Sequence, residues 1–172
     1  MLKENFWKTL ISIFFFTCGC LFVLNTYQEL NDSSNLGSVN GLIDFAKKYS
    51  RHDFLQVLSS NIIVLIVILY AGFFTGGLMS ALVLFWNGLI AMLVFVQFAD
   101  MYAFDKLLYA FMLHGSIELP VFFIAANKSY RGLNFYLSMY REKLNLNLIP
   151  SPKEFAGLGA ALVLAALVET NL

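Results

Sequence analysis

Long apolar runs separated by short polar segments dominate the chain. Five runs approach the roughly 20 residues that a helix needs to cross a bilayer. They cover residues 10–24, 61–75, 77–98, 107–126 and 155–168. The pattern predicts an all-α, polytopic membrane helix bundle of about five transmembrane helices, forming a single membrane domain over residues 1–172.

Two of the polar segments carry apolar residues at helical spacing. The first segment, at residues 42–51, places charged residues between Leu42, Ile43, Phe45, Ala46 and Tyr49. The second, between residues 127 and 153, has the same spacing at Leu133, Tyr136, Leu137, Tyr140 and Leu144. Helices of this kind lie in the membrane interface with the apolar face in lipid. We therefore expect interfacial amphipathic helices in addition to the spans.

The second run begins and ends at residues that suggest a boundary. Asn61, at its mouth, is a candidate cap for the helix. Gly72, Gly76 and Gly77 interrupt the apolar residues at its end. Irregular backbone is tolerated at membrane depth where protein buries it. We expect a break or a re-entrant segment near Gly72–Gly77.

Composition agrees with a membrane protein. The chain is 59% hydrophobic and 13% charged, with 18 Phe and 8 Tyr, whereas soluble domains run about 45–50% apolar and about 25% charged. Lys and Arg together number 11, as do Asp and Glu, so no basic surface indicates nucleic acid. Cys18 and Cys20, two positions apart in an apolar run, point to different sides of a helix and are read as small apolar side chains.

The distribution of basic residues predicts the orientation. Five spans place the two termini on opposite sides of the membrane. With the N-terminus inside, the cytoplasmic side holds seven of the 11 basic residues, namely Lys3, Lys8, Lys128, Arg131, Arg141, Lys143 and Lys153. Because cytoplasmic loops carry an excess of Lys and Arg, we expect a multi-pass protein of the cell membrane with a cytoplasmic N-terminus and an outer C-terminus.

His114 and Glu118 are the most unusual residues of the fourth run. Residues four apart share one face of a helix, and an ionisable group at membrane depth usually faces a partner or a wet cavity. Three interpretations stay open: a structural contact between helices, a proton or ion relay through Glu118, and a metal or hydrolytic centre. Zinc needs three protein ligands, and the one other histidine, His52, lies in an outer polar segment. We therefore expect no metal site and no catalytic residue.

Other polar and small residues in the runs are typical of helix packing. Asn87 can bridge helices through its amide, and Gly88 lets another backbone come close. With Asn61, His114 and Glu118, Asn87 forms the buried polar centre that we expect. Pro120 predicts a kink one turn after Ser116. The residues expected to serve packing are Gly72, Gly76, Gly77, Gly88, Gly115 and Pro120.

The segment between the fourth and fifth runs is basic and aromatic. Lys128, Arg131, Arg141 and Lys143 lie among tyrosines there. Such a segment either anchors anionic lipid heads or docks a cytoplasmic partner such as an ATPase. The sequence has no Walker A pattern and no HExxH or GxSxG motif. We therefore expect no enzyme activity and no cofactor.

The order of motifs between Asn61 and Ala126 resembles the stage II sporulation protein M family, also known as the domain of unknown function 95 family. An Asn opens an apolar helix, glycines follow at a break, Asn-Gly comes next, and His-Gly-x-x-Glu-Leu-Pro is the most specific element. The matching residues are Asn61, Gly72, Gly76, Gly77, Asn87, Gly88, His114, Gly115, Glu118, Leu119, Pro120, Ala125 and Ala126.

The resemblance implies a membrane subunit without established chemistry of its own. It implies peptide export, maturation or immunity of the bacteriocin type beside an ABC-type ATPase, with membrane lipid and other membrane subunits as partners. The alternatives are a sporulation-type scaffold for cell-wall hydrolases during engulfment, and an intramembrane hydrolase that uses His114 and Glu118. Self-association into a homo-oligomer is a further alternative.

Overall fold

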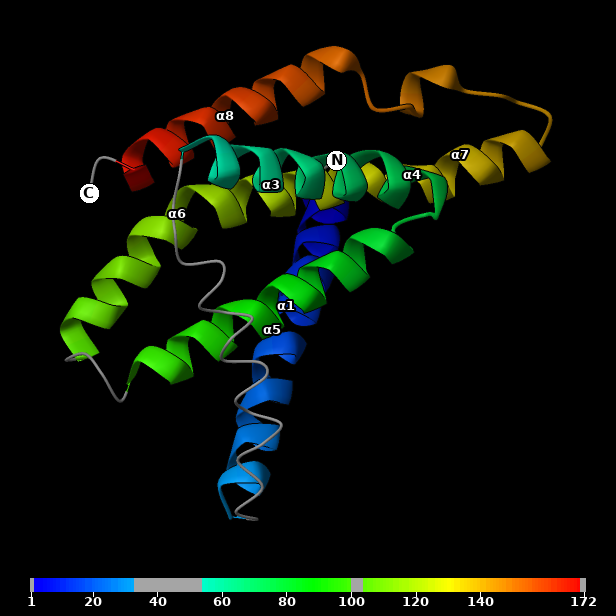
Figure 1. The fold of residues 1–172 in the computed structure, drawn as a ribbon. Coiled ribbons are helices and arrows are strands. Elements are labelled where there is room, and N and C mark those ends of the chain that lie inside the picture. The colour runs from blue at the N-terminus through cyan, green and yellow to red at the C-terminus, as the bar shows by residue number, and fades with distance from the viewer. Residues whose placement is uncertain (1, 33–53, 100–103, 171–172) are drawn as a thin grey trace.

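In the part of the chain that it describes, the computed structural model contains only helices and the turns and short loops that join them (Figure 1). It describes residues 2–32, 54–99 and 104–170, with the side chains of residues 6–26, 54–96 and 115–167. The helices are α1 (Leu2–Asp32), α3 (Phe54–Ile66), the π-helix η1 (Val67–Ala71), α4 (Gly72–Phe74), α5 (Leu78–Ala99), α6 (Phe104–Ser129), α7 (Arg131–Tyr140), the 3-10 helix η2 (Leu146–Leu148) and α8 (Pro152–Thr170).

Four segments are long and apolar enough to cross a membrane. They are Phe6–Thr26, Phe54–Phe74, Leu78–Val96 and Leu146–Leu167, which confirms the expected all-helical membrane fold. The expected span at residues 107–126 falls in α6, a helix of 26 residues whose side chains are described only from Gly115 onward. The amphipathic helix expected at residues 42–51 lies outside the described residues.

The second span begins earlier than the sequence predicts. Asn61 does not cap a helix, because α3 starts at Phe54 and Asn61 lies well inside it. The hydroxyl groups of Ser59 and Ser60 donate to the carbonyls of Gln56 and Val57 in the same helix. These bonds give both serine hydroxyl groups an acceptor within the helix, so the polar residues before Asn61 continue the helix instead of ending it.

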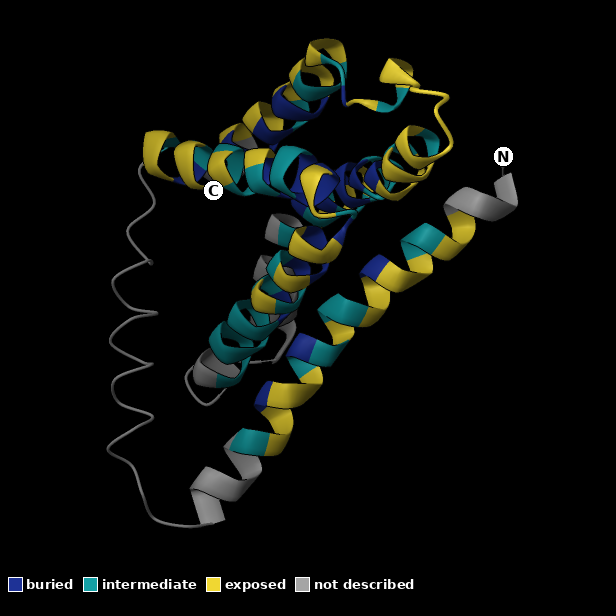
Figure 2. Cartoon of the chain, turned by 90° about the vertical axis from the view of Figure 1, so that its right-hand side faces the viewer, coloured by how far each residue is buried: buried dark blue, intermediate teal, exposed yellow. Residues whose placement is uncertain are grey.

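The core is built from buried residues of α3, η1, α5, α6 and α8. Its fully buried members include Leu65, Leu84, Ala126 and Leu162. The long helix α1 packs mainly along α5. Figure 2 shows that the other face of α1 is exposed along much of its length, as expected for a helix that borders lipid.

Close contacts bring four segments together at one end of the bundle. Asn127, near the end of α6, donates to the hydroxyl of Thr9 near the start of α1. Gly77, in the turn between α4 and α5, lies against the ring of Tyr130. Lys128 bonds Glu154 at the start of α8. Successive spans that alternate in direction produce this arrangement.

Local capping sets the ends of the segment that follows α6. We expected the amphipathic helix to include Leu144, but α7 ends at Tyr140 because Glu142 has a left-handed backbone with φ 56°. The amides of Glu142 and Lys143 then bond the carbonyls of Met139 and Ser138, which is the Schellman ending of a helix. Further on, Pro152 takes the first position of α8, where its missing N–H costs nothing.

Candidate functional site

A carboxylate and an amide meet in the interior of the bundle. The Asn61 Nδ2 of α3 donates a hydrogen bond to the Glu118 Oε1 of α6. Glu118 is only 6% exposed, so its carboxylate is buried inside the helix bundle. A buried polar group costs about 1–3 kcal/mol when it loses its hydrogen bond. The pair therefore holds α3 and α6 in one register.

Of the other two members of the expected polar centre, the structure describes only the side chain of Asn87. The Asn87 Nδ2 donates to the Val83 carbonyl of its own helix at 2.8 Å, and Asn87 has no described contact with Glu118. His114 lies on α6 one turn before Glu118, and its side chain is outside the described residues. Among the three members whose side chains are described, the structure brings Asn61 and Glu118 together.

A second buried polar cluster lies beside the π-helix η1, which follows α3. The hydroxyls of Ser80 and Ser129 are 2.6 Å apart, and both residues are fully buried. The Ser80 Oγ also lies 2.8 Å from the Ile68 carbonyl in the π-helix, and the Ser129 Oγ donates to the Ala126 carbonyl. The sequence does not reveal this cluster, because a π-helix leaves no pattern in the sequence and single serines are common in membrane helices.

Gly72 makes the serine cluster possible. A Cβ at Gly72 would lie 1.9 Å from the Ser80 Oγ and 3.0 Å from the Ser129 Cβ. Only a residue without a side chain allows the ends of three segments, η1–α4, α5 and α6, to come this close. The close approach explains why the apolar run is interrupted at this position.

The two glycines after α4 form a tight turn. Gly76 and Gly77 have φ values of 64° and 101°, which favour glycine. A Cβ at Gly77 would lie 2.1 Å from the ring of Tyr130. The sequence predicted a break here, and the structure shows a π-helix followed by this turn.

Helices α1 and α5 cross through a pair of glycines. A Cβ at Gly88 would lie 2.1 Å from the Phe16 carbonyl, and one at Gly19 would lie 2.0 Å from the Phe85 carbonyl. The Cys20 thiol donates to the Gly88 carbonyl at 3.3 Å. Gly88 was predicted to allow such an approach, but Gly19 was not, because it lies in a run of aromatic and cysteine residues without a second glycine at helical spacing.

The remaining packing candidates have local roles in the described part of the chain. A Cβ at Gly115 would meet only Leu119 of the same helix. Pro120 is exposed and lies inside α6, which continues to Ser129. Neither residue brings a second helix close.

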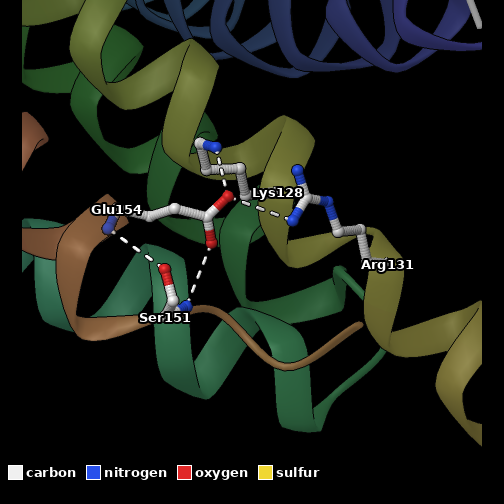
Figure 3. Close-up of polar contacts among 4 residues, drawn as sticks. All are labelled: Lys128, Arg131, Ser151 and Glu154. Atoms are coloured by element: carbon white, nitrogen blue, oxygen red, sulfur yellow. Dashed lines mark hydrogen bonds and ion pairs between the residues drawn. The ribbon is translucent and has the colours of Figure 1, made fainter. Parts of the chain in front are cut away.

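The four basic residues of the expected contact surface separate into two pairs. Lys128 and Arg131 both bond the Glu154 Oε1, at 2.5 and 3.1 Å (Figure 3). Arg141 and Lys143 are exposed beyond the end of α7, and neither forms an ion pair within the described residues. The first pair therefore joins helices inside the protein, and the second pair faces outward.

Residues 131–149 form a surface that we call the α7 platform. Its first half is fixed to α4, because a Cβ at Gly132 would lie 1.9 Å from the Phe73 carbonyl and the Tyr136 hydroxyl donates to the Phe74 carbonyl at 2.5 Å. The platform exposes large apolar side chains at its surface, with Tyr140 at 89% exposed. The others are Leu133, Tyr136, Leu137, Met139, Leu144, Leu146 and Ile149.

Comparison with known proteins identifies the family. The family described as Stage II sporulation protein M matches residues 9–172, which confirms the resemblance. Nothing matches among curated proteins or among solved structures. Within the described residues, no group of three His, Cys, Asp or Glu side chains lies close enough to hold a metal ion.

Proposed function

Because this chain belongs to the stage II sporulation protein M family, we propose that it is a non-catalytic membrane subunit of a larger complex. The complex serves export, maturation or immunity of a bacteriocin-type peptide, together with a cytoplasmic ABC-type ATPase. The buried pairs Asn61–Glu118 and Ser80–Ser129 support a structural role, since each bonds one helix to another.

The α7 platform is the observation that carries this proposal. Eight of its large apolar side chains are exposed, although its first half is firmly seated on α4. An exposed apolar patch bordered by polar residues marks an interaction site. Arg141 and Lys143 border this patch, so a partner that offers apolar residues beside carboxylates fits it best.

The proposed orientation places the platform in the cytoplasm. The start of α1, the α4–α5 turn, the platform and the start of α8 share one end of the bundle. That end collects the seven basic residues counted above for the cytoplasmic side. The excess of positive charge supports a cytoplasmic position, where an ATPase is within reach.

Charge reversal tests the docking of the ATPase. The tagged full chain is extracted from its native cell in mild detergent, and the accompanying proteins are identified by mass spectrometry. We expect a stoichiometric ABC-type ATPase with the wild-type chain and its loss with Arg141→Glu combined with Lys143→Glu, because the partner's carboxylates then face like charges.

The matched control exchanges the two cations. Arg141→Lys combined with Lys143→Arg keeps both charges in place and is expected to retain the ATPase. A wild-type chain that never brings an ATPase with it would contradict the export proposal.

The family description favours a second candidate function. A sporulation-type scaffold would bind cell-wall hydrolases on the outer side of the membrane and would not bind an ATPase. The same extraction separates the two candidates, because a hydrolase recovered without an ATPase would support the scaffold.

A further inference from the structure

Glu154 uses its two carboxylate oxygens for two different tasks. Its Oε1 accepts hydrogen bonds from the Lys128 Nζ at 2.5 Å and the Arg131 Nη1 at 3.1 Å. Its Oε2 accepts from the backbone amide of Ser151 at 3.0 Å, while the Glu154 amide donates to the Ser151 Oγ at 3.3 Å (Figure 3). The second set of bonds is the reciprocal capping box of α8.

The first task closes a loop around the α7 platform. Lys128 lies in the last turn of α6, Arg131 is the first residue of α7, and Glu154 lies in the first turn of α8. The chain leaves this junction at residue 131 and returns to it at residue 151. One carboxylate therefore holds both ends of the platform against the spans.

The attraction between Glu154 and the two cations holds the ends of α6, α7 and α8 together. The side chains of Lys128 and Glu154 are each 22% exposed, and that of Arg131 is 35% exposed, so water and salt screen the three charges only in part. Lys128 and Arg131 are three residues apart and repel each other without an anion between them. Neutralising Glu154 removes the attraction that joins the ends of α6 and α7 to α8, and it leaves Lys128 and Arg131 as neighbouring like charges without their anion.

We propose that Glu154 is a latch that fixes the α7 platform to the ends of α6 and α8. With the latch closed, the platform and the start of α8 move as one body. With the latch open, the outer half of the platform moves independently, while Gly132 and Tyr136 keep the start of α7 on α4. A partner that pulls on the platform would thereby move α8; this consequence rests on the proposed function, but the latch itself does not.

The latch is tested by electron spin resonance on the full chain in lipid nanodiscs. Cys18 and Cys20 are replaced by alanine, and spin labels are attached at Leu146 on the platform and Leu82 on α5, which are both exposed. We expect one narrow distance distribution in the parent chain. In the Glu154→Gln variant we expect a broad distance distribution, although glutamine still completes the capping box.

Three further variants keep the test decisive. Lys128→Gln combined with Arg131→Gln removes the cations from the other side and should broaden the distribution equally. Glu142→Gln neutralises an exposed carboxylate of the platform and should leave the distribution narrow. Ser151→Ala weakens the cap of α8 but not the ion pairs, and should also leave it narrow.

The outcomes separate the latch from the docking proposal. Narrow distributions in both Glu154→Gln and the Lys128/Arg131 variant would overturn the latch, whatever binds the platform. Broadening by Ser151→Ala alone would assign the effect to capping and would also overturn it. The extraction experiment above decides the ATPase separately, because it measures which proteins accompany the chain and not how the platform moves.

Discussion

Glu118 shows which part of a buried contact a sequence reveals. An ionisable residue in an apolar run marks itself as unusual, so this carboxylate could be predicted to be buried and paired. Asn61 could be predicted as one member of the same polar centre, but the choice of Asn61 over Asn87 as its hydrogen-bond partner depends on how the helices pack. The two serines at Gly72 could not be predicted either, since neither breaks the apolar pattern.

Substitution of Glu118 distinguishes helix packing from chemistry. Glu118→Gln keeps an oxygen that accepts from Asn61, so we expect near-normal assembly and thermal stability in detergent. Glu118→Leu leaves the Asn61 amide without this acceptor and should destabilise the bundle by about 1–3 kcal/mol. If Glu118→Gln unfolds the protein as readily as Glu118→Leu, the charge itself is needed. If it folds normally but loses a hydrolytic activity, the intramembrane hydrolase gains support.

At the scale of the elements, apolar runs predict well where helices form, but they predict poorly where and how those helices are interrupted. Gly72, Gly76 and Gly77 indicated a break, but nothing in the sequence indicates the π-helix before them, in which the Ile68 carbonyl accepts from the Ser80 hydroxyl of another helix. The end of α7 at a glutamate with positive φ is also hidden from sequence, because glycine usually takes that position. Helix boundaries set by side chains from other helices escape periodicity.

The glycine crossing of α1 and α5 makes an element-scale prediction. Gly88→Ala places a Cβ where the Phe16 carbonyl lies, so the two backbones must separate at a cost of about 1–3 kcal/mol. Gly157→Ala is the matched control, because a Cβ there meets nothing within 4 Å. Thermal unfolding followed by size-exclusion chromatography in detergent measures both. Equal stability of the two variants would contradict the close crossing.

At the scale of the whole molecule, hydropathy predicts the bundle but not the surface that the bundle presents. The basic segment after α6 could be predicted to contact a partner or lipid. The sequence could not show that Glu154 takes Lys128 and Arg131 for an internal contact and leaves Arg141 and Lys143 exposed. That division depends on the return of the chain at α8, which only the tertiary structure reveals.

The side of the membrane on which the α7 platform lies tests the account most directly. A single cysteine introduced by Asn145→Cys, an exposed platform position outside the segment Leu146–Leu167, in a chain with Cys18 and Cys20 replaced by alanine, is treated with a membrane-impermeant maleimide. We predict labelling in inverted membrane vesicles and none in intact cells, with the opposite result for Asn25→Cys at the far end of the α1 span. Labelling of Asn145→Cys in intact cells would place the platform outside, where no cytoplasmic ATPase can dock.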